Sequence, residues 1–200
     1  MTSLTYSLLI PTTKEPTNGI TTTKDPRLLW KIDEILVSNV AGIGKARNDL
    51  AERATGDVLV YADDDIRIQK EAWDAVETLA PRTLLMLQGH SHPITRFMAV
   101  HRETYNELGG FDPFLTRNAE DYDFYWTALR KGIPVIELPS RYVKHVPHGK
   151  RLKTRDHLES AYTRVKHGNV TLHFFVQKNP LIAITRLLGV IYYNLKGTSV

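Results

Sequence analysis

Residues 39–66 read NVAGIGKARNDLAERATGDVLVYADDDI, and this stretch decides the fold. Residues 44–54 predict a helix with one apolar face, which Gly56 then terminates. Residues 58–62, VLVYA, are apolar on both faces of an extended chain, as in the buried strands of parallel sheets. That strand stops at three consecutive aspartates at positions 63–65. The stretch therefore predicts a helix followed by a buried strand whose carboxyl end is acidic.

On both sides of this stretch, predicted strands alternate with predicted helices. We expect strands at 4–10, 34–37, 83–88, 96–101, 135–138 and 140–145, helices at 26–31, 70–80 and 119–131, and mostly helical sequence afterwards. The helix at 119–131 is expected to bury Tyr122, Tyr125, Trp126 and Leu129, which share one face. The alternation through residue 138 indicates an α/β protein with a mostly parallel central sheet.

Size and composition describe an ordinary soluble globular chain. It has 200 residues, of which 42% are hydrophobic and 24% charged, so one domain with a large core is expected. It has no cysteine, which excludes disulfides, thiolate zinc sites and cysteine nucleophiles and fits a reducing compartment. The start of the chain lacks the basic and long apolar parts of a signal peptide, so we expect a cytoplasmic protein.

The charge distribution suggests anionic partners. A net charge of +4 fits nucleotide diphosphates, phospholipid headgroups or nucleic acid. Because a basic run at 141–155 precedes an apolar segment at 179–195, we favour a membrane surface and expect no nucleic acid. Arg186 interrupts that segment, which is also shorter than the roughly 20 residues that span a bilayer. Two alternatives stay open for it: a helix at the inner face of the membrane, or one that packs on the domain or on a second copy in a homodimer.

The three aspartates allow two interpretations. Adjacent carboxylates repel one another, so they need water, hydrogen-bond donors or a cation. The carboxyl ends of strands line the ligand crevice of an open α/β sheet, where Asp63 and Asp65 point to the same side and can hold Mg²⁺ or Mn²⁺. The other interpretation is that the aspartates cap the helix that follows, a position that Asp favours.

The order of these features resembles family 2 glycosyltransferases, in which an Ala-Arg-Asn helix precedes an apolar strand that ends in an Asp-x-Asp motif. The resemblance implies a GT-A fold, the Rossmann-like fold of nucleotide-diphospho-sugar transferases, with helices flanking a mostly parallel sheet. We expect this domain over residues 1–150 and a helical extension over residues 151–200.

The resemblance also implies roles for the motif residues on the donor side. Asp65 would coordinate a metal that bridges the diphosphate of the sugar donor, and Asp63 would contact the ribose or the metal shell. Asp64 lies between them at the donor site. Arg47 would lie near the nucleotide, where a guanidinium suits phosphate; the alternative is an exposed helix residue.

Residues 95–132 are similar to the acceptor-side half of the same family, with a strand, a short helix, Gly-Gly-Phe-Asp, and Glu-Asp at a helix start. The resemblance implies that Asp121, with Glu120 as its neighbour, takes the proton from the acceptor hydroxyl, and that direct displacement inverts the anomeric configuration. The alternative is helix capping, with Asn118 as the N-cap and both acids in the first turn.

A late strand completes the resemblance. Residues 141–149, RYVKHVPHG, are similar to the strand in which some members carry a histidine near the metal and diphosphate. His145 is the better candidate for this role and His148 the weaker, while Lys150 and Arg151 are alternative phosphate contacts.

The chain departs from the family in its abridged N-terminal half. Ser38 and Asn39 stand where the family usually carries an acidic residue that reads the nucleobase. The nearest substitutes for donor contact are in the loop after the first strand, namely Pro11, Thr12, Thr13 and Glu15, and Asp33 is a remoter one.

We therefore predict a hexosyltransferase that uses a nucleotide-sugar donor and a glycan or lipid-linked acceptor. A non-catalytic protein that binds nucleotide sugars or carbohydrate is the alternative from another class. A sugar nucleotidyltransferase is a further rival, but it normally needs a Gly-rich, basic loop after the first strand, and PTTKEPTNG is a poor version of one.

Overall fold

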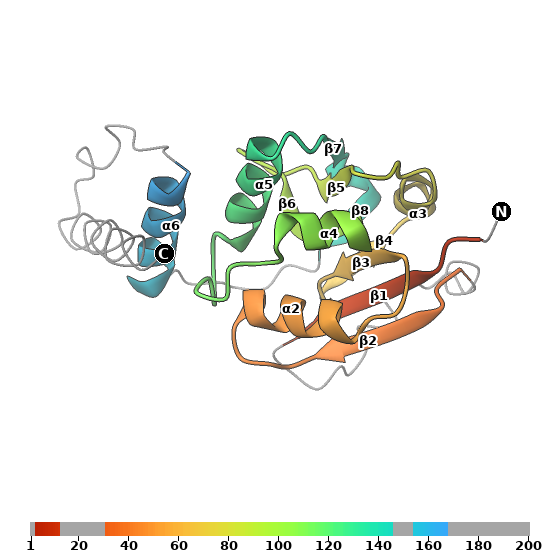
Figure 1. The fold of residues 1–200 in the computed structure, drawn as a ribbon, viewed down its shortest axis with the longest axis horizontal. Helices are drawn as coiled ribbons and strands as arrows, with labels where there is room; N and C mark the ends of the chain where they lie inside the picture. Colours follow the sequence, from red (N-terminus) through yellow and green to blue (C-terminus); the bar gives the residue numbers. More distant parts are fainter. Residues whose placement is uncertain (1–2, 13–30, 146–153, 168–200) are drawn as a thin grey trace.

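A computed structural model describes residues 3–12, 31–145 and 154–167, and a six-stranded sheet forms its centre (Figure 1). In spatial order the strands are β2 (Glu34–Ser38), β1 (Tyr6–Pro11), β3 (Val58–Ala62), β6 (Ile94–His101), β5 (Leu84–Leu87) and β7 (Val135–Leu138). Every neighbouring pair is parallel except the two that β6 makes, with β3 and β5. The predicted mostly parallel α/β sheet is confirmed.

Helices cover both faces of this sheet. On one face lie α2 (Ile43–Arg53), α4 (Arg102–Leu108) and α5 (Glu120–Arg130), and on the other lies α3 (Lys70–Glu77) (Figure 1). The side chains of β3 alternate between the two cores, with Val58, Val60 and Ala62 in one and Leu59 and Tyr61 in the other. This burial on both faces is why VLVYA carries no polar residue.

A second, two-stranded sheet follows the three aspartates. It pairs β4 (Ile66–Ile68) with β8 (Val143–His145) in antiparallel register, so that Ile66 lies opposite His145. The sequence pattern missed β4, and a 3-10 helix (Ser140–Tyr142) occupies the first half of the expected strand at 140–145. Because β4 follows the aspartates and α3 begins only at Lys70 with Gln69 as its N-cap, helix capping by the aspartates is wrong.

The buried face of α5 differs from the expected one. Its buried residues are Asp123, Phe124 and Ala128, whereas Leu129 is 40% exposed. Asp123 is buried because Lys166 and His167 pair with its carboxylate. Apolar periodicity predicts the wrong face because a charged residue with a distant partner occupies a core position.

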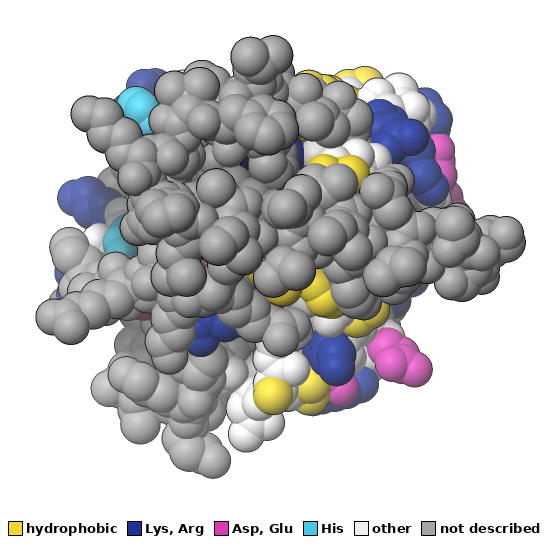
Figure 2. All heavy atoms as spheres, turned by 90° about the vertical axis from the view of Figure 1, so that its left-hand side faces the viewer, with side chains coloured by type: hydrophobic (Ala, Val, Ile, Leu, Met, Phe, Trp, Pro, Cys, Tyr) yellow, Lys and Arg dark blue, Asp and Glu magenta, His cyan; other side chains and the backbone are white. Residues whose placement is uncertain are grey.

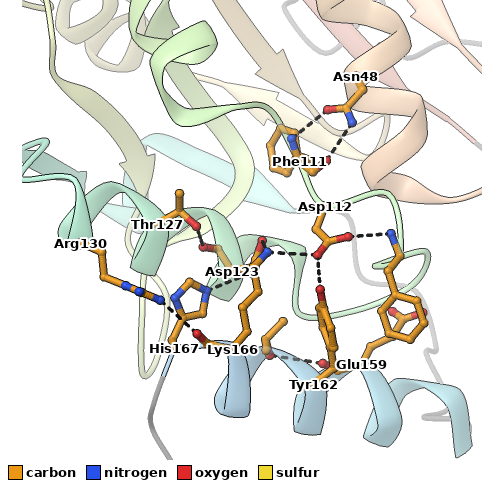
Figure 3. Close-up of polar contacts among 12 residues, drawn as sticks. Asn48, Phe111, Asp112, Asp123, Thr127, Arg130, Glu159, Tyr162, Lys166 and His167 are labelled. Atoms are coloured by element: carbon orange, nitrogen blue, oxygen red, sulfur yellow. Dashed lines mark hydrogen bonds and ion pairs between the residues drawn. The ribbon is translucent and has the colours of Figure 1, made fainter. Parts of the chain in front are cut away.

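The last described helix, α6 (Thr154–Lys166), lies beside α5 (Figures 1 and 3). Lys166 Nζ lies 2.9 Å from Asp123 and 3.0 Å from Asp112, and the Tyr162 hydroxyl donates to Asp112 at 2.6 Å. Figure 2 shows the side of the molecule that carries α6, where Lys and Arg side chains are prominent around the rim. The division of the chain at residue 150 stays a prediction.

Several sequence predictions fall outside the described residues. They concern the helix expected at 26–31, the residues Thr13, Glu15, His148, Lys150 and Arg151, and the apolar segment 179–195. In the ranges 3–12, 31–145 and 154–167, no helix is long and apolar enough to cross a membrane.

Candidate functional site

A cleft of about 540 Å³ opens at the carboxyl ends of β1, β2 and β3. We call it the aspartate cleft. It brings together many of the predicted site residues: Pro11, Thr12, Arg47, Asp63, Asp64, Asp65 and Glu120. Four acidic residues and the three arginines Arg47, Arg96 and Arg117 are part of its lining. A cleft of this composition suits an anionic ligand that is accompanied by a cation.

Arg47 is the central buried charge of this cleft. Arg47 is only 1% exposed, so the alternative interpretation of Arg47 as an exposed helix residue is wrong. Nη1 donates to Glu120 Oε1 at 3.0 Å, and Nη2 donates to Asp63 Oδ1 at 3.2 Å. The guanidinium also lies over the ring of Phe111, 5.2 Å from its centroid. Arg47 therefore joins the end of β3 to the start of α5.

The carboxylates of the cleft are only partly neutralised by the protein. Burial raises the pKa of Asp63 to about 7, against the influence of Arg47 and with a further contribution from Asp65 and Glu120. Burial and the Asp121 carboxylate likewise raise the pKa of Glu120. In both groups burial is the largest cause of the raised pKa, and the charge of neighbouring carboxylates adds to it. A cation bound there would favour the ionised carboxylates.

The other two aspartates contact separate elements. Thr12 Oγ1, just after β1, donates to Asp64 Oδ2. Asp65 Oδ2 lies 3.2 Å from His145 Nε2, although 80 residues separate them in the sequence. The β4–β8 register produces this pair, because Asp65 immediately precedes Ile66, the partner of His145. The structure therefore brings His145 next to Asp65, and the role of His145 near a metal and a diphosphate stays a prediction.

Asp65 and His145 offer only part of the ligand set that a metal needs. Among the described residues, no group of three or more His, Asp or Glu side chains can hold an ion. One carboxylate and one imidazole suit Mn²⁺ or Mg²⁺ only when further oxygen ligands come from a bound molecule. A phosphorylated ligand in the aspartate cleft would supply such oxygens.

The sequence pattern missed several residues of the cleft. Arg96 Nε at the start of β6 lies 3.9 Å from Asp63 Oδ2, and Arg117 reaches the cleft while it pairs with Asp156 of α6 at 2.9 Å. Arg96 could have been predicted as a site residue, because a basic residue near the start of an apolar strand is unusual. The sequence contains no such signal for Arg117, because the position of its side chain depends on α6.

A second cavity, of about 290 Å³, lies beside Asp121, and we call it the Asp121 cavity. The loop after β5, the start of α5 and α6 enclose it, with His90, Ser91, His92, Ile94, Asn118, Ala119, Asp121, Tyr122, Ser160, Thr163 and Arg164 as its lining. His92 Nε2 lies 3.5 Å from Asp121 Oδ1. Glu120 and Asp121, adjacent in sequence, therefore face different cavities.

Residues 116–121 separate the two cavities, and we call them the partition. Thr116, Arg117 and Glu120 line the aspartate cleft, whereas Asn118, Ala119 and Asp121 line the Asp121 cavity. The N-cap of α5 is Ala119 in a left-handed conformation with φ 66°. Asn118 Nδ2 instead donates to the Asp156 carbonyl and to Ser160 Oγ of α6, so the predicted capping by Asn118 is wrong.

The Ala-Arg-Asn and Gly-Gly-Phe-Asp motifs are in direct contact. Asn48 Nδ2 donates to the Phe111 carbonyl and its Oδ1 accepts from the Phe111 amide, each at 2.8 Å (Figure 3). Gly110 has φ 74°, and a Cβ at this position would lie 3.0 Å from Asn48 Oδ1. The glycine therefore provides the turn that lets Asn48 hold the chain just before the partition.

No family model matches the chain, and no curated protein matches it by sequence. Solved structures do match. A mannosyltransferase from Pyrobaculum calidifontis, in complex with GDP-Man and Mn²⁺, superposes with a TM-score of 0.60 at 17% identity over 97% of this chain and 71% of its own. Glucosyl-3-phosphoglycerate synthase from Mycobacterium tuberculosis, with Mg²⁺ and UDP, gives 0.64 at 14% identity over 84% and 80%.

The catalytic domain of a Drosophila β1,4-galactosyltransferase 7, in complex with xylobiose, gives a TM-score of 0.57 at 14% identity over 80% of this chain and 79% of its own. At such identities the likeness establishes the fold alone. The chain has the GT-A fold, with its sheet flanked by helices as expected.

Proposed function

We propose that this chain is a glycosyltransferase that moves a sugar from a nucleoside-diphosphate donor to an acceptor hydroxyl. The observation that carries the proposal is the pair of cavities on the two sides of the partition. One is lined by four acidic residues and three arginines, and the other by one carboxylate and one arginine among mostly uncharged side chains and histidines. Donor and acceptor must meet in one geometry, and the two cavities adjoin each other at the start of α5, where Glu120 and Asp121 are consecutive residues.

The donor would occupy the aspartate cleft. Guanidinium groups recognise phosphate oxygens, and Arg96 and Arg117 reach the cleft from separate elements. Asp65 and His145 would hold Mn²⁺ or Mg²⁺ together with diphosphate oxygens, and the ion would stabilise the charge of the departing diphosphate. The solved mannosyltransferase with the same fold was found with GDP-Man and Mn²⁺, which supports this assignment.

The nucleoside would lie along the loop that follows β2. Asn39, Val40 and Ala41 line the cleft next to Thr12 at the end of β1. Asp33 lies elsewhere, since its carboxylate accepts from the Tyr6 amide at 2.7 Å. Base recognition by Asn39, with backbone groups of the same loop, is therefore part of the proposal.

The acceptor would enter the Asp121 cavity. Asp121 would take the proton of the acceptor hydroxyl. At the same time the hydroxyl oxygen would form a bond to the anomeric carbon of the donor sugar, and the bond from that carbon to the diphosphate would break. Attack from the side opposite the leaving group inverts the configuration at that carbon. Ser91, Asn118 and Ser160 are among the polar residues that line this cavity, and polar side chains of this kind can form hydrogen bonds with the hydroxyls of a glycan.

The test is a panel of nucleotide sugars, mainly hexose donors, with Mn²⁺ or Mg²⁺ and a set of glycan and lipid-linked acceptors. Release of nucleoside diphosphate with a glycosylated product supports transfer, and the anomeric configuration of the product tests inversion. Metal-dependent binding of a donor without turnover would instead support a non-catalytic binding protein. A parallel incubation with nucleoside triphosphates and sugar 1-phosphates, which forms a nucleotide sugar and releases pyrophosphate only if the chain is a nucleotidyltransferase, tests that rival.

A lipid-linked acceptor would place the protein at the inner face of the membrane. The basic run 141–155 and the apolar segment 179–195 support this part of the proposal. Flotation with anionic liposomes, compared between the full chain and a chain ending at residue 178, tests it. Equal flotation of both chains would exclude an anchor in that segment, and sedimentation of the full chain would test the homodimer.

A further inference from the structure

The backbone amides of the partition converge on one side chain of α6. Glu159 Oε1 accepts from the Thr116 amide at 3.1 Å and from the Thr116 hydroxyl at 2.8 Å. Its Oε2 accepts from the amides of Arg117 and Asn118 at 2.9 and 2.8 Å. Glu159 is fully buried. Successive amides that point at one carboxylate form an anion-binding concavity, so this segment is shaped around Glu159.

The carbonyls on the other side of the same segment bind α2. The Ile43 amide donates to the Thr116 carbonyl at 3.0 Å, and the Gly44 amide donates to the Leu115 carbonyl at 3.2 Å. A Cβ on Gly44 would lie 2.7 Å from the Asp112 carbonyl oxygen, so glycine is needed for this approach. The loop segment that leads into Glu120 and Asp121 is therefore held between α2 and Glu159.

Glu159 itself is fixed by the docking of α6. Lys166, the last residue of α6, pairs with Asp112 and Asp123, and Tyr162 donates to Asp112 (Figure 3). Closer to Glu159, Arg117 Nε donates to Asp156 at 2.9 Å. These contacts lie on both sides of Glu159 along α6, so its carboxylate is held at a defined place against the partition.

We propose that Glu159 is a positioning residue for transfer, which sets the partition so that Asp121 and the aspartate cleft have the geometry that the reaction needs. This inference rests on the proposed function. Glu159 lines neither of the two cavities described above, and it acts through the backbone of residues 116–118. Loss of its charge would move Asp121 relative to the donor while the donor contacts of Asp65 and His145 stay in place.

The experiment compares Glu159→Gln with Glu159→Asp, which keeps the charge, and with two controls. Glu107→Gln removes an exposed carboxylate that pairs with Arg82, and Val76→Ala destabilises the core on the opposite face of the sheet. Two properties are measured in the full chain: hydrogen exchange of the amides of residues 116–118, and the rates of transfer and of donor hydrolysis with Mn²⁺.

In Glu159→Gln we expect faster exchange at residues 116–118 with unchanged protection of α3. We expect kcat for transfer to fall about 10- to 100-fold, the cost of a displacement of up to about 1 Å at reacting groups. The ratio of donor hydrolysis to transfer should rise, and the Kd for the nucleoside diphosphate should change less than kcat. Glu159→Asp should recover part of the transfer rate, and Glu107→Gln should equal the parent chain.

Two results would overturn the inference in an active protein. One is unchanged exchange at residues 116–118 in Glu159→Gln. The other is faster exchange with a kcat and a hydrolysis ratio equal to those of Val76→Ala, which would make the role of Glu159 purely structural. A parent chain that transfers no sugar from any donor would instead refute the proposed function, and the positioning role with it.

Discussion

Arg47 Nη1 on α2 lies 3.0 Å from Glu120 Oε1 on α5, across 73 residues of sequence. This ion pair joins the half of the molecule that carries the three aspartates to the half that carries the partition. Both side chains are nearly buried, at 2% and 13% exposure. Arg47 therefore has a structural role and an electrostatic role at once, since it also offsets the charge of Asp63.

The first prediction concerns removal of this buried cation. Arg47→Met would leave the Glu120 carboxylate without its cationic partner and Asp63 with only the more distant Arg96, which should cost about 3–5 kcal/mol of unfolding free energy. Urea denaturation measures the loss. Arg53→Met, on the same helix but in an exposed pair with Asp49, is the matched control and should cost less than about 1 kcal/mol.

A double variant tests the reason for the loss. Arg47→Met combined with Glu120→Gln should be less destabilised than the sum of the two single variants, because the second change removes one uncompensated charge. Additive losses would contradict the electrostatic explanation.

The second prediction concerns metal-dependent binding. Asp65→Ala should weaken the Mn²⁺-dependent binding of UDP or GDP by about 10- to 100-fold or more, the range for loss of a group that supports a metal. His145→Gln should also weaken the Mn²⁺-dependent binding of the nucleoside diphosphate. Titration calorimetry with and without Mn²⁺ measures both variants. The control, Asp74→Asn, changes an exposed carboxylate that pairs with Lys70 and should bind as the parent chain does.

The third prediction separates the two cavities. Asp121→Asn should keep nucleoside-diphosphate binding and lose about 10²- to 10⁴-fold in transfer rate, the usual contribution of a general base. Glu103→Gln, an exposed change on α4, is the control for both assays. If Asp65→Ala and Asp121→Asn lost donor binding equally while both stayed folded, the division between a donor cleft and an acceptor cavity would be wrong.

The fourth prediction concerns the docking of α6 and its pH dependence. Burial alone would raise the pKa of Asp112, but hydrogen bonds from Tyr162 and Phe114 and the charge of Lys166 outweigh it and hold the pKa below its usual value. A lowered folded pKa means that the ionised form stabilises the native state. This stabilisation is complete above the unfolded pKa of about 3.9 and is lost as the pH falls through the folded pKa.

A comparison of the parent chain with Asp112→Asn tests whether the ionised Asp112 carboxylate stabilises the native state. The parent should be the more stable at pH 6, and the difference in unfolding free energy should shrink as the pH falls below about 4. Urea denaturation between pH 6 and pH 3 measures the difference. A difference that stays constant over this range would show that Asp112 stabilises α6 by some means other than its charge.

Much of the sheet could be predicted because its signals are local. VLVYA is buried on both faces in β3, and the short apolar runs of β5 and β7 lie within one residue of their expected places. The antiparallel direction of β6 could not be predicted, because a buried strand has the same apolar pattern whether it is parallel or antiparallel to its neighbours. β4 was missed because its three residues are stabilised by β8, far along the chain.

The kinds of residue at the site, and their order along the chain, follow from local sequence: an acidic run at the end of a buried strand, an arginine on the preceding helix, and two acids at a helix start. Only the tertiary structure decides that Arg47 is buried, that His145 meets Asp65 and that Glu120 and Asp121 face separate cavities. The physical reason is distance along the chain. Periodicity reports which face of one element is apolar, whereas each of these arrangements depends on elements brought together from as far as 80 residues apart.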